Sequence, residues 1–371
     1  MTDLHVGLIS GTSMDGIDAV VVDLAPARPE LLASNTFEFP ADIHSALDTL
    51  RADPDQFPLR ALGWLDACLG QALGRAAKEI VANAGLHSDQ ISAIGSHGQT
   101  VLHRIDSDPS HTLQIGDPSR IAEITGITTV ADFRRADVAA GGQGAPLAPL
   151  IHAAMLGQDE ERRAVINLGG IANITLLKDH AIQAGFDSGP ANCFLDLWYR
   201  RHHPDRFDHQ GQWASEGKID AAWLHQLLDD PYFGKPPPKS TGIEYFSARW
   251  LEQRLPKWSN DRPQDIQATL AEFSARTLAG PLSDISLDRV LICGGGVHNH
   301  DLVQRISSHL NSSNPNGLPI EATDSHGLPA DHVESVLFAW LAAQRLAGVR
   351  LATNPVTGAV KSVCLGSIYS A

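Results

Sequence analysis

A short run of small and polar residues near the start of the chain has the composition of a phosphate-binding turn. It stands between two β-prone runs, 5–10 and 17–24, and is bounded by a glycine at each end. Glycines let the backbone curl and approach a ligand closely, and successive N–H groups in such a turn can bind an anion. Its two aspartates add carboxylates beside these N–H groups. A phosphate bound by the N–H groups, together with Mg²⁺ near the carboxylates, would explain why both kinds of group occur together. The residues concerned are Gly11, Thr12, Ser13, Met14, Asp15, Gly16, Ile17 and Asp18.

Two further glycine runs follow strand-like segments. Gly169 and Gly170 join the β-prone runs 163–168 and 171–177. A third run of glycines follows the apolar run 289–293. A strand–turn–strand unit at the start of each half indicates an internal duplication. Two such turns facing each other across a cleft can hold nucleotide phosphates, and the third run can receive the nucleoside. The third run is Gly294, Gly295 and Gly296. Asn167 and Asn173 flank the second turn, where they can bind phosphate or tie the turn.

The composition is that of an ordinary globular protein with an acidic surface. Among the 371 residues, 43% are hydrophobic and 19% are charged, which is enough apolar material for a sizeable core. The formal net charge of −15 argues against a nucleic-acid-binding face, which would need to be basic. The four cysteines are far apart, so neither a disulfide framework nor a thiolate zinc site is indicated. No apolar run approaches the length of a membrane span, so the sequence predicts a cytoplasmic protein without membrane contact.

The elements that must position these turns alternate between strands and helices. After the first hairpin, the pattern predicts a strand over 31–39, a helical region over 42–84, and short strands ending near 96, 115 and 131. Helices are predicted over 118–125, from 263, from 300 and over 331–347, with a helix also following Pro190. The glycine-rich stretch 139–146 marks a composition shift. We therefore expect two domains, 1–131 and 132–371, with the last residues able to pack back on the first.

Several other nucleotide and metal signatures are missing from the sequence. The nearest approach to a P-loop, 211–218, has the wrong spacing and lacks the hydroxyl residue, and no dinucleotide-binding glycine fingerprint opens a helix. A small histidine cluster in the polar loop 202–209 lacks carboxylates at helical spacing, so metal binding there is not favoured.

The order of the motifs along the chain resembles that of the anhydro-N-acetylmuramic acid kinases, a family of the actin-like ATPase and sugar-kinase superfamily. The matching blocks cover nearly the full length. The chain departs from the usual family pattern in having Ser188, Ala191 and Ile243 where many members carry Thr, Gly and Arg. The blocks are GTSMDGID (11–18), GSHGQTV (95–101), LQIGDPSRIAEITGI (113–127), DFRRADVAAGGQGAPL (132–147), INLGGIANIT (166–175), FDSGPANCFLD (186–196), KPPPKSTG (235–242) and ICGGGVHN (292–299).

This resemblance implies two actin-like (ribonuclease H-like) α/β domains with a central cleft that closes on the substrate. It also implies a reaction in peptidoglycan recycling. ATP and water act on 1,6-anhydro-N-acetylmuramic acid to give N-acetylmuramate 6-phosphate and ADP. ATP and Mg²⁺ are the implied cofactors, with Asp15 on the magnesium side through water, and a homodimer is the implied assembly. The sequence by itself fixes neither the oligomeric state nor the tolerance for peptide-bearing sugars.

The resemblance also places residues at the sugar. Asp187 matches the family's aspartate that activates water, and a helix dipole just after it would keep its carboxylate ionised. His97 would hydrogen-bond sugar oxygens, Arg134 would pair with a carboxylate or phosphate oxygen, and Glu334 would contact the sugar. The structural alternatives are that Asp187 or Ser188 only caps its helix. For Glu334, the alternative is a capping box at the start of the last helix, and for the other two a surface loop or salt bridge.

Two other functions stay open at this point. The same scaffold could phosphorylate an ordinary open amino sugar, with Asp187 deprotonating a sugar hydroxyl instead of water. The chain could also be a non-catalytic nucleotide-binding module, although its many polar residues beyond the phosphate turns argue against this.

Overall fold

The computed structural model describes residues 2–11, 16–26, 29–237, 239–312 and 317–371, and in it the chain forms two compact units. The first unit combines 1–151 with 327–371, and the second consists of 152–326. Helix α5 (Ala148–Leu156) carries the chain from the first unit into the second. Within the described ranges, no helix is both long and apolar enough to cross a lipid bilayer.

The first unit is built on a six-stranded mixed sheet. Its strand order is β13-β7-β4-β1-β2-β3, in which β2 runs antiparallel to its neighbours β1 and β3, while β1, β4 and β7 are mutually parallel. A separate two-stranded hairpin, β5–β6, follows β4. The strands are β1 (Leu4–Ile9), β2 (Ile17–Asp23), β3 (Glu30–Phe37), β4 (Ala93–Ser96), β5 (Gln99–Arg104), β6 (His111–Ile115), β7 (Thr129–Ala131) and β13 (Ser367–Tyr369).

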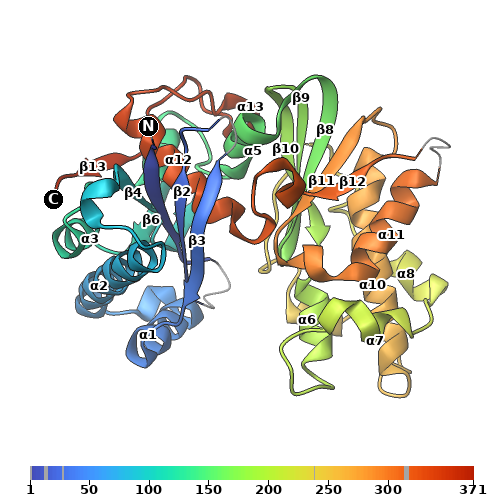
Figure 1. The fold of residues 1–371 in the computed structure, drawn as a ribbon. Coiled ribbons are helices and arrows are strands. Elements are labelled where there is room, and N and C mark those ends of the chain that lie inside the picture. Colours follow the sequence, from blue (N-terminus) through green and yellow to red (C-terminus); the bar gives the residue numbers. More distant parts are fainter. Residues whose placement is uncertain (1, 12–15, 27–28, 238, 313–316) are drawn as a thin grey trace. The chain divides into compact units, whose positions relative to one another are not determined.

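Helices cover both faces of this sheet (Figure 1). Alternate residues of β1, from Leu4 through Val6 to Leu8, share one core with α1 and α2, because side chains of a strand alternate between its faces. On the opposite face α12 packs against β1 and β4. The helices of the first unit are α1 (Ala41–Ala52), α2 (Leu59–Asn83), α3 (Pro118–Thr125), α4 (Phe133–Ala139), α12 (Val333–Leu346) and α13 (Asn354–Thr357).

The second unit repeats the same topology. Its five strands follow the order β10-β9-β8-β11-β12, with β9 antiparallel to β8 and β10, and with β8, β11 and β12 parallel. One sheet face shares a core with α6, α8, α9, α10 and α11. The elements are β8 (Gln158–Leu168), β9 (Ile171–Asp179), β10 (Ala181–Pro190), β11 (Arg289–Cys293), β12 (Ile320–Ala322), α6 (Cys193–Tyr199), α7 (Gln212–Ser215), α8 (Ala221–Leu228), α9 (Ala248–Glu252), α10 (Pro263–Ala279) and α11 (His300–Asn311).

The two units therefore share one strand order, in which an antiparallel three-stranded meander is extended by parallel strands. This is the arrangement expected of ribonuclease H-like domains, so the predicted fold class and the predicted internal duplication are confirmed. Each duplicated hairpin, β1–β2 and β8–β9, opens its own unit.

The division between the units differs from the expected one at residue 131/132. Residues 132–151 and 327–371 group with the first unit. The reason lies in long-range pairing, because β13 pairs antiparallel with β7 and α12 packs on β1 and β4.

Two other local expectations change. The predicted helical region 42–84 is interrupted, because Pro54 and Pro58 separate α1 from α2. The segment before Pro190 is a full strand, β10, and α6 begins only at Cys193.

The close approach of α12 to the sheet depends on two paired glycines. Gly7 of β1 and Gly95 of β4 are register partners, and a Cβ on either would come within 1.8 Å and 1.9 Å, respectively, of the carbonyl oxygens of Ser335 and Phe338. The backbone of α12 therefore occupies the space that a side chain at position 7 or 95 would need.

We predict that Gly95→Ala destabilises the protein by about 1–3 kcal/mol or more, the usual cost of overpacking a core. Urea-induced unfolding followed by circular dichroism measures this difference. Gly63→Ala in α2 is the matched control, because a Cβ there meets no atom within 4 Å. An alanine in an exposed helix should instead stabilise by about 0.5–1 kcal/mol. Equal effects of the two substitutions would contradict this account of the α12 contact.

Candidate functional site

The first predicted phosphate turn connects β1 to β2. Four of its predicted residues lie outside the described part of the chain: Thr12, Ser13, Met14 and Asp15. Gly11, which is partly exposed, and Gly16 border them. A Cβ on Gly16 would lie 2.6 Å from the carbonyl oxygen of Phe37, so this glycine is required by close packing on β3. Turn chemistry is thus not the only reason for glycine at this position.

The start of β2 carries the other two predicted residues of this turn. Ile17 is buried in the core of the first unit and pairs with Phe37. The Asp18 carboxylate accepts a hydrogen bond of 2.6 Å from the Thr36 hydroxyl. It also lies close enough to Glu334 to raise the pKa of that carboxyl by charge repulsion, an effect smaller than that of desolvation. Two carboxylates therefore lie near each other beside the turn.

His97, Arg134 and Glu334 come together in the first unit. Nε of Arg134 donates to Nε2 of His97 over 2.9 Å, and Nη1 donates to the Gly144 carbonyl oxygen over 2.8 Å. Burial lowers the pKa of Arg134, while the nearby carboxylates of Glu334 and Asp137 act in the opposite direction. The arrangement holds a guanidinium near a carboxylate, and within the described ranges hydrogen bonds engage two of its five N–H groups.

His97 itself is engaged within the chain at both ring nitrogens. Its Nδ1 lies 3.0 Å from the Gly98 carbonyl oxygen, and its ring stacks on Phe338 with 4.6 Å between centroids. Burial, reinforced by the charge of Arg134, lowers its pKa well below the ordinary value. In this conformation His97 contacts Arg134, and the predicted direct contact with sugar oxygens would need one of these bonds to open.

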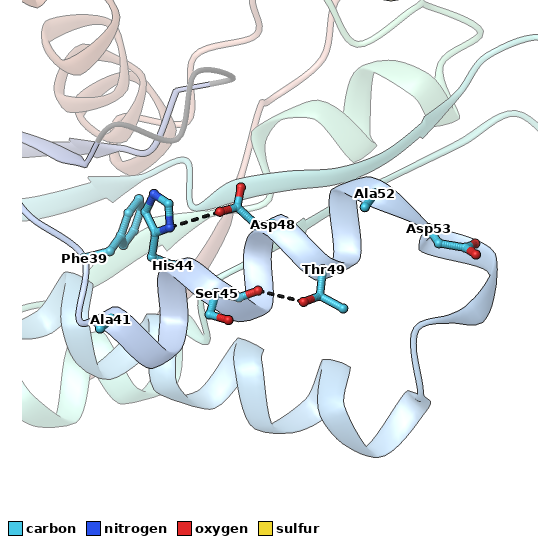
Figure 2. A pocket seen from close by; sticks show the side chains of 8 residues that line it. All are labelled: Phe39, Ala41, His44, Ser45, Asp48, Thr49, Ala52 and Asp53. Atoms are coloured by element: carbon cyan, nitrogen blue, oxygen red, sulfur yellow. Dashed lines mark hydrogen bonds and ion pairs between the residues drawn. The ribbon is translucent and has the colours of Figure 1, made fainter. Parts of the chain in front are cut away.

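Surface pockets of the first unit include one along α1 and one beside β4. Figure 2 shows one along α1, where His44 pairs with Asp48 and the Thr49 hydroxyl donates to the Ser45 carbonyl. None of the predicted site residues lines this pocket, so it does not mark the site. The other pocket has Ser96, His97 and Gly98 in its wall.

In the second unit, three polar side chains form a row across three strands. Asn167 of β8 pairs with Asn173 of β9, and Asn173 pairs with Asp187 of β10. Directly paired residues of antiparallel strands point to the same face. Their neighbours Ile166, Ile174 and Phe186 belong to the helical core, so the polar row occupies the opposite face.

Asp187 is held by bonds to both its backbone and its carboxylate. The Thr241 N–H donates to Oδ2 over 2.9 Å, and the Asn173 side chain also hydrogen-bonds to this carboxylate. Its own N–H donates to the Lys239 carbonyl over 3.0 Å, and the Tyr232 hydroxyl donates to its carbonyl oxygen over 2.7 Å. The segment 239–241 thus runs beside β10 and fixes the orientation of the aspartate.

The pKa of Asp187 is raised. Desolvation by burial raises it to about 6, against the opposing hydrogen bonds from Thr241 and Asn173. The helix dipole that the sequence suggested as a stabilising factor is not adjacent, because α6 begins six positions later, at Cys193. A carboxylate with this pKa can accept a proton near neutral pH more readily than an ordinary aspartate.

The two capping alternatives are not observed. The N-cap of α6 is Asn192, and the Ser188 hydroxyl instead donates to the Ala172 carbonyl. The N-cap of α12 is His332, and no side-chain capping bond is present there, so Glu334 does not complete a capping box. Neither Asp187 nor Glu334 is explained by helix termination.

The second and third glycine runs lie beside the polar row. The carbonyl oxygens of Gly169 and Gly170 accept bonds from backbone N–H groups at the start of α6. A Cβ on Gly294 would come within 2.2 Å of the Asn167 side-chain oxygen, whereas Gly295 is open. The run continues through Gly296 into a short 3-10 turn that precedes α11.

Residues outside the predicted site also support it. The sequence assigned no role to Lys239, whose ammonium lies over the Tyr232 ring at 4.7 Å. Thr241 and Asn173 contact the Asp187 carboxylate. The sequence predicts Asn173 beside the second glycine turn but not its contact with Asp187, and for Thr241 its one signal is the family-like block 235–242. The Ile243 side chain, which replaces the usual Arg, is exposed.

No histidine, cysteine, aspartate and glutamate side chains gather into a group of three or more that could hold a metal, as far as the described residues show. Of the histidines in 202–209, His202 and His203 lie among aromatic rings, with His203 stacked on Tyr199 at 4.3 Å between centroids. The cysteines that the structure describes are free thiols.

Comparison with known proteins bears on the whole chain. The family model described as anhydro-N-acetylmuramic acid kinase matches residues 3–371. A protein of that name from Xanthomonas campestris pv. campestris (strain 8004) is 50% identical over 373 residues, covering 99% of this chain and 97% of the relative. The protein of that name from Pasteurella multocida (strain Pm70) is 42% identical, covering 99% of this chain and 97% of the relative.

Among solved structures, the activator of 2-hydroxyisocaproyl-CoA dehydratase from Clostridium difficile with bound ADPNP aligns at a TM-score of 0.45 and 13% identity, covering 95% of this chain and 99% of that chain. The family match and the identity to full-length relatives agree with the motif order and with the duplicated fold. The chain belongs to the anhydro-N-acetylmuramic acid kinase family.

Proposed function

We propose that this protein opens 1,6-anhydro-N-acetylmuramic acid with water and phosphorylates O6 at the expense of ATP, in the recycling of cell-wall fragments. The products are N-acetylmuramate 6-phosphate and ADP. The observation that carries the proposal is the full-length family match, together with a carboxylate of raised pKa at the family's aspartate. The two open alternatives, an open-sugar kinase and a non-catalytic module, lack a comparable observation.

Asp187 is the proposed base. Its carboxylate takes a proton from water as the water oxygen bonds to the anomeric carbon. The bond from that carbon to the bridging oxygen breaks, and the released oxygen takes the γ-phosphoryl group while the bond to ADP breaks. Asn173 and the Thr241 N–H hold the carboxylate during this step. A positioned base typically contributes about 10²–10⁴-fold to the rate.

Arg134 and Glu334 are the proposed sugar contacts of the first unit, with His97 supporting Arg134. The guanidinium would bind a carboxylate or phosphate oxygen of the substrate through its remaining N–H groups. Support comes from the bond between Arg134 and His97 and from the nearby Glu334 carboxylate.

The glycine runs are the proposed ATP contacts. The phosphates would be bound by the first turn, Gly11 to Gly16 with Ile17 and Asp18, and by the second, Gly169 and Gly170 with Asn167. The adenosine would be bound by the third run, Gly294 to Gly296. The open position at Gly295 and the packing of Gly294 on Asn167 are consistent with this assignment. Catalysis of phosphoryl transfer rests mainly on such positioning and charge stabilisation.

Reaction in ¹⁸O-labelled water tests the proposed function. The label should appear at the anomeric hydroxyl of N-acetylmuramate 6-phosphate, because water attacks that carbon. A coupled assay of ADP release with the anhydro sugar measures turnover in parallel. Sugar-dependent ADP release without label in the product would favour the open-sugar kinase, and no sugar-dependent release would favour the non-catalytic module.

We predict that Asp187→Asn abolishes turnover while ATP binding survives. The amide keeps the shape of the side chain but cannot accept the proton from water. Turnover is measured by ADP release and binding by isothermal titration calorimetry with a non-hydrolysable ATP analogue. Ser188→Ala is the matched control on the same strand, because its hydroxyl donates to the Ala172 carbonyl and, among the described residues, makes no hydrogen bond to Asp187. Near-normal product formation by Asp187→Asn would reject the assignment.

The pH dependence of kcat/KM for the sugar is a second prediction. Because burial raises the pKa of Asp187 to about 6, the base is protonated and inactive below that pH. The value of kcat/KM should therefore fall by about tenfold per pH unit on the acid side. An ordinary aspartate would place this decline nearer pH 4. An acid limb centred near pH 4, in protein that stays folded, would contradict the raised pKa.

Mg²⁺ would accompany ATP, with Asp15 on the magnesium side through a water molecule, since Mg²⁺ keeps much of its hydration. We predict that Asp15→Ala raises the Mg²⁺ concentration needed for half-maximal rate. A magnesium titration at fixed ATP measures this, and an unchanged midpoint would oppose the role. The homodimer stays an expectation from the family resemblance, and the cytoplasmic location stays a prediction from the sequence.

A further inference from the structure

We propose that Asp137 is a positioning residue, which acts through the backbone of Gly144 to hold Arg134 against His97 and thereby keeps the His97 proton on Nδ1. The inference rests on the proposed function, because it concerns how the Arg134 contact with the substrate is prepared. All of the groups involved belong to the first unit.

Asp137 is a fully buried carboxylate, one helical turn after Arg134 in α4. Its Oδ2 accepts the Gly144 N–H over 2.7 Å, and its Oδ1 accepts the Thr357 hydroxyl over 2.8 Å. It forms no ion pair within 4.0 Å in the part of the chain that the structure describes. Burying a carboxylate without an ion pair is costly unless hydrogen bonds stabilise it. The bonds from Gly144 and Thr357 provide that stabilisation, together with the nearby charge of Arg134.

The loop that follows α4 is shaped around this carboxylate. A Cβ on Gly142 would lie 2.2 Å from Oδ2 of Asp137. Gly144 has a φ of 71°, and a Cβ there would come within 2.9 Å of Val138. Only glycine combines this positive φ with so close an approach at low cost. The loop can therefore fold over Asp137 and turn the Gly144 carbonyl back towards α4.

That carbonyl is one of two acceptors that orient the guanidinium. Gly144 O accepts Nη1 of Arg134 at 2.8 Å, and Nε2 of His97 accepts Nε of Arg134 at 2.9 Å. The Gly144 N–H that Asp137 holds and the Gly144 carbonyl that Arg134 contacts belong to the same residue. Displacing the N–H therefore also displaces the carbonyl. Asp137 thus acts on Arg134 through a single glycine.

The bond from Arg134 fixes the tautomer of His97. An arginine Nε–H can only donate, so Nε2 of His97 must offer a lone pair. The proton of the neutral ring is then on Nδ1, which faces the Gly98 carbonyl oxygen at 3.0 Å. Among the described residues, hydrogen bonds engage two of the five guanidinium N–H groups, and we assign the others to a substrate oxyanion.

A purely structural role for Asp137 is the competing explanation, since it also ties α4 to Thr357 of α13. Three variants separate the two roles. Asp137→Ala removes both bonds. Thr357→Val is the matched control, because it removes the bond at Oδ1 and leaves the Gly144 bond in place. Asp137→Asn is the conservative rescue, since its amide oxygen can accept the Gly144 N–H while its NH₂ donates to the Thr357 hydroxyl.

The first measurement is the tautomer of His97 in the substrate-free protein, read from the ¹⁵N shifts of the histidine ring with His97→Gln for assignment. Wild type, Asp137→Asn and Thr357→Val should show the proton on Nδ1, and Asp137→Ala should show a mixture of tautomers. This readout needs no activity. A proton on Nε2 in the wild-type protein would overturn the proposal, even if Asp137→Ala fails to fold.

The second measurement is steady-state kinetics. Asp137→Ala should raise KM for the sugar by about tenfold, as for one hydrogen bond to a charged group, with KM for ATP and kcat nearly unchanged. Thr357→Val and Asp137→Asn should keep the wild-type KM. Equal effects of Asp137→Ala and Thr357→Val, with the tautomer unchanged, would show a structural role only and overturn the proposal.

Arg134→Ala distinguishes failure of this inference from failure of the proposed function. If Arg134→Ala raises KM for the sugar but Asp137→Ala changes neither KM nor the tautomer, the inference fails and the proposed function stands. If Arg134→Ala leaves KM for the sugar unchanged, the assigned sugar contact fails, while the tautomer still reports whether Asp137 orients Arg134.

Discussion

Strand pairing in the second unit is the constraint on which its chemistry depends. The register of β8, β9 and β10 places Asn167, Asn173 and Asp187 side by side. A shift of one residue in either pairing would turn the aspartate into the helical core, because side chains alternate along a strand. The apolar residues next to them in sequence, such as Ile174 and Phe186, oppose that shift because they fill the core on the other face of the sheet. Packing on one face of the sheet thus secures the polar groups on the other.

Each unit fixes the orientation of one charged side chain, but with different groups. In the second unit, the Asp187 carboxylate is held directly by a neighbouring side chain and a backbone N–H. In the first, the guanidinium of Arg134 is held by a histidine ring and by a glycine carbonyl. The groups that hold Asp187 are an amide side chain and a backbone N–H, neither of which titrates. Burial keeps the pKa of His97, which holds Arg134, well below its ordinary value.

Much of the fold and part of the site could be predicted from the sequence, and the remainder depends on long-range contacts. The three glycine runs, Asp187 and the duplicated hairpins are local patterns, so short windows of sequence indicated them. Strand β10 was missed because Gly185, Gly189 and Pro190 interrupt its alternation of apolar and polar residues. The raised pKa of Asp187 follows from burial, which no spacing reveals. The roles of Thr241 and Asp137 depend on partners that are distant in the chain.

The pairing of β13 with β7 joins residues 367–369 to residues 129–131. The second unit is continuous in sequence, whereas the first needs α12 and β13 from beyond it. During synthesis, residues 152–326 leave the ribosome before the first sheet has its outer strand, so the second unit can fold while the first is still incomplete. The site around Arg134 and Glu334 is therefore assembled last, although His97 and Arg134 are among the earlier residues to be made.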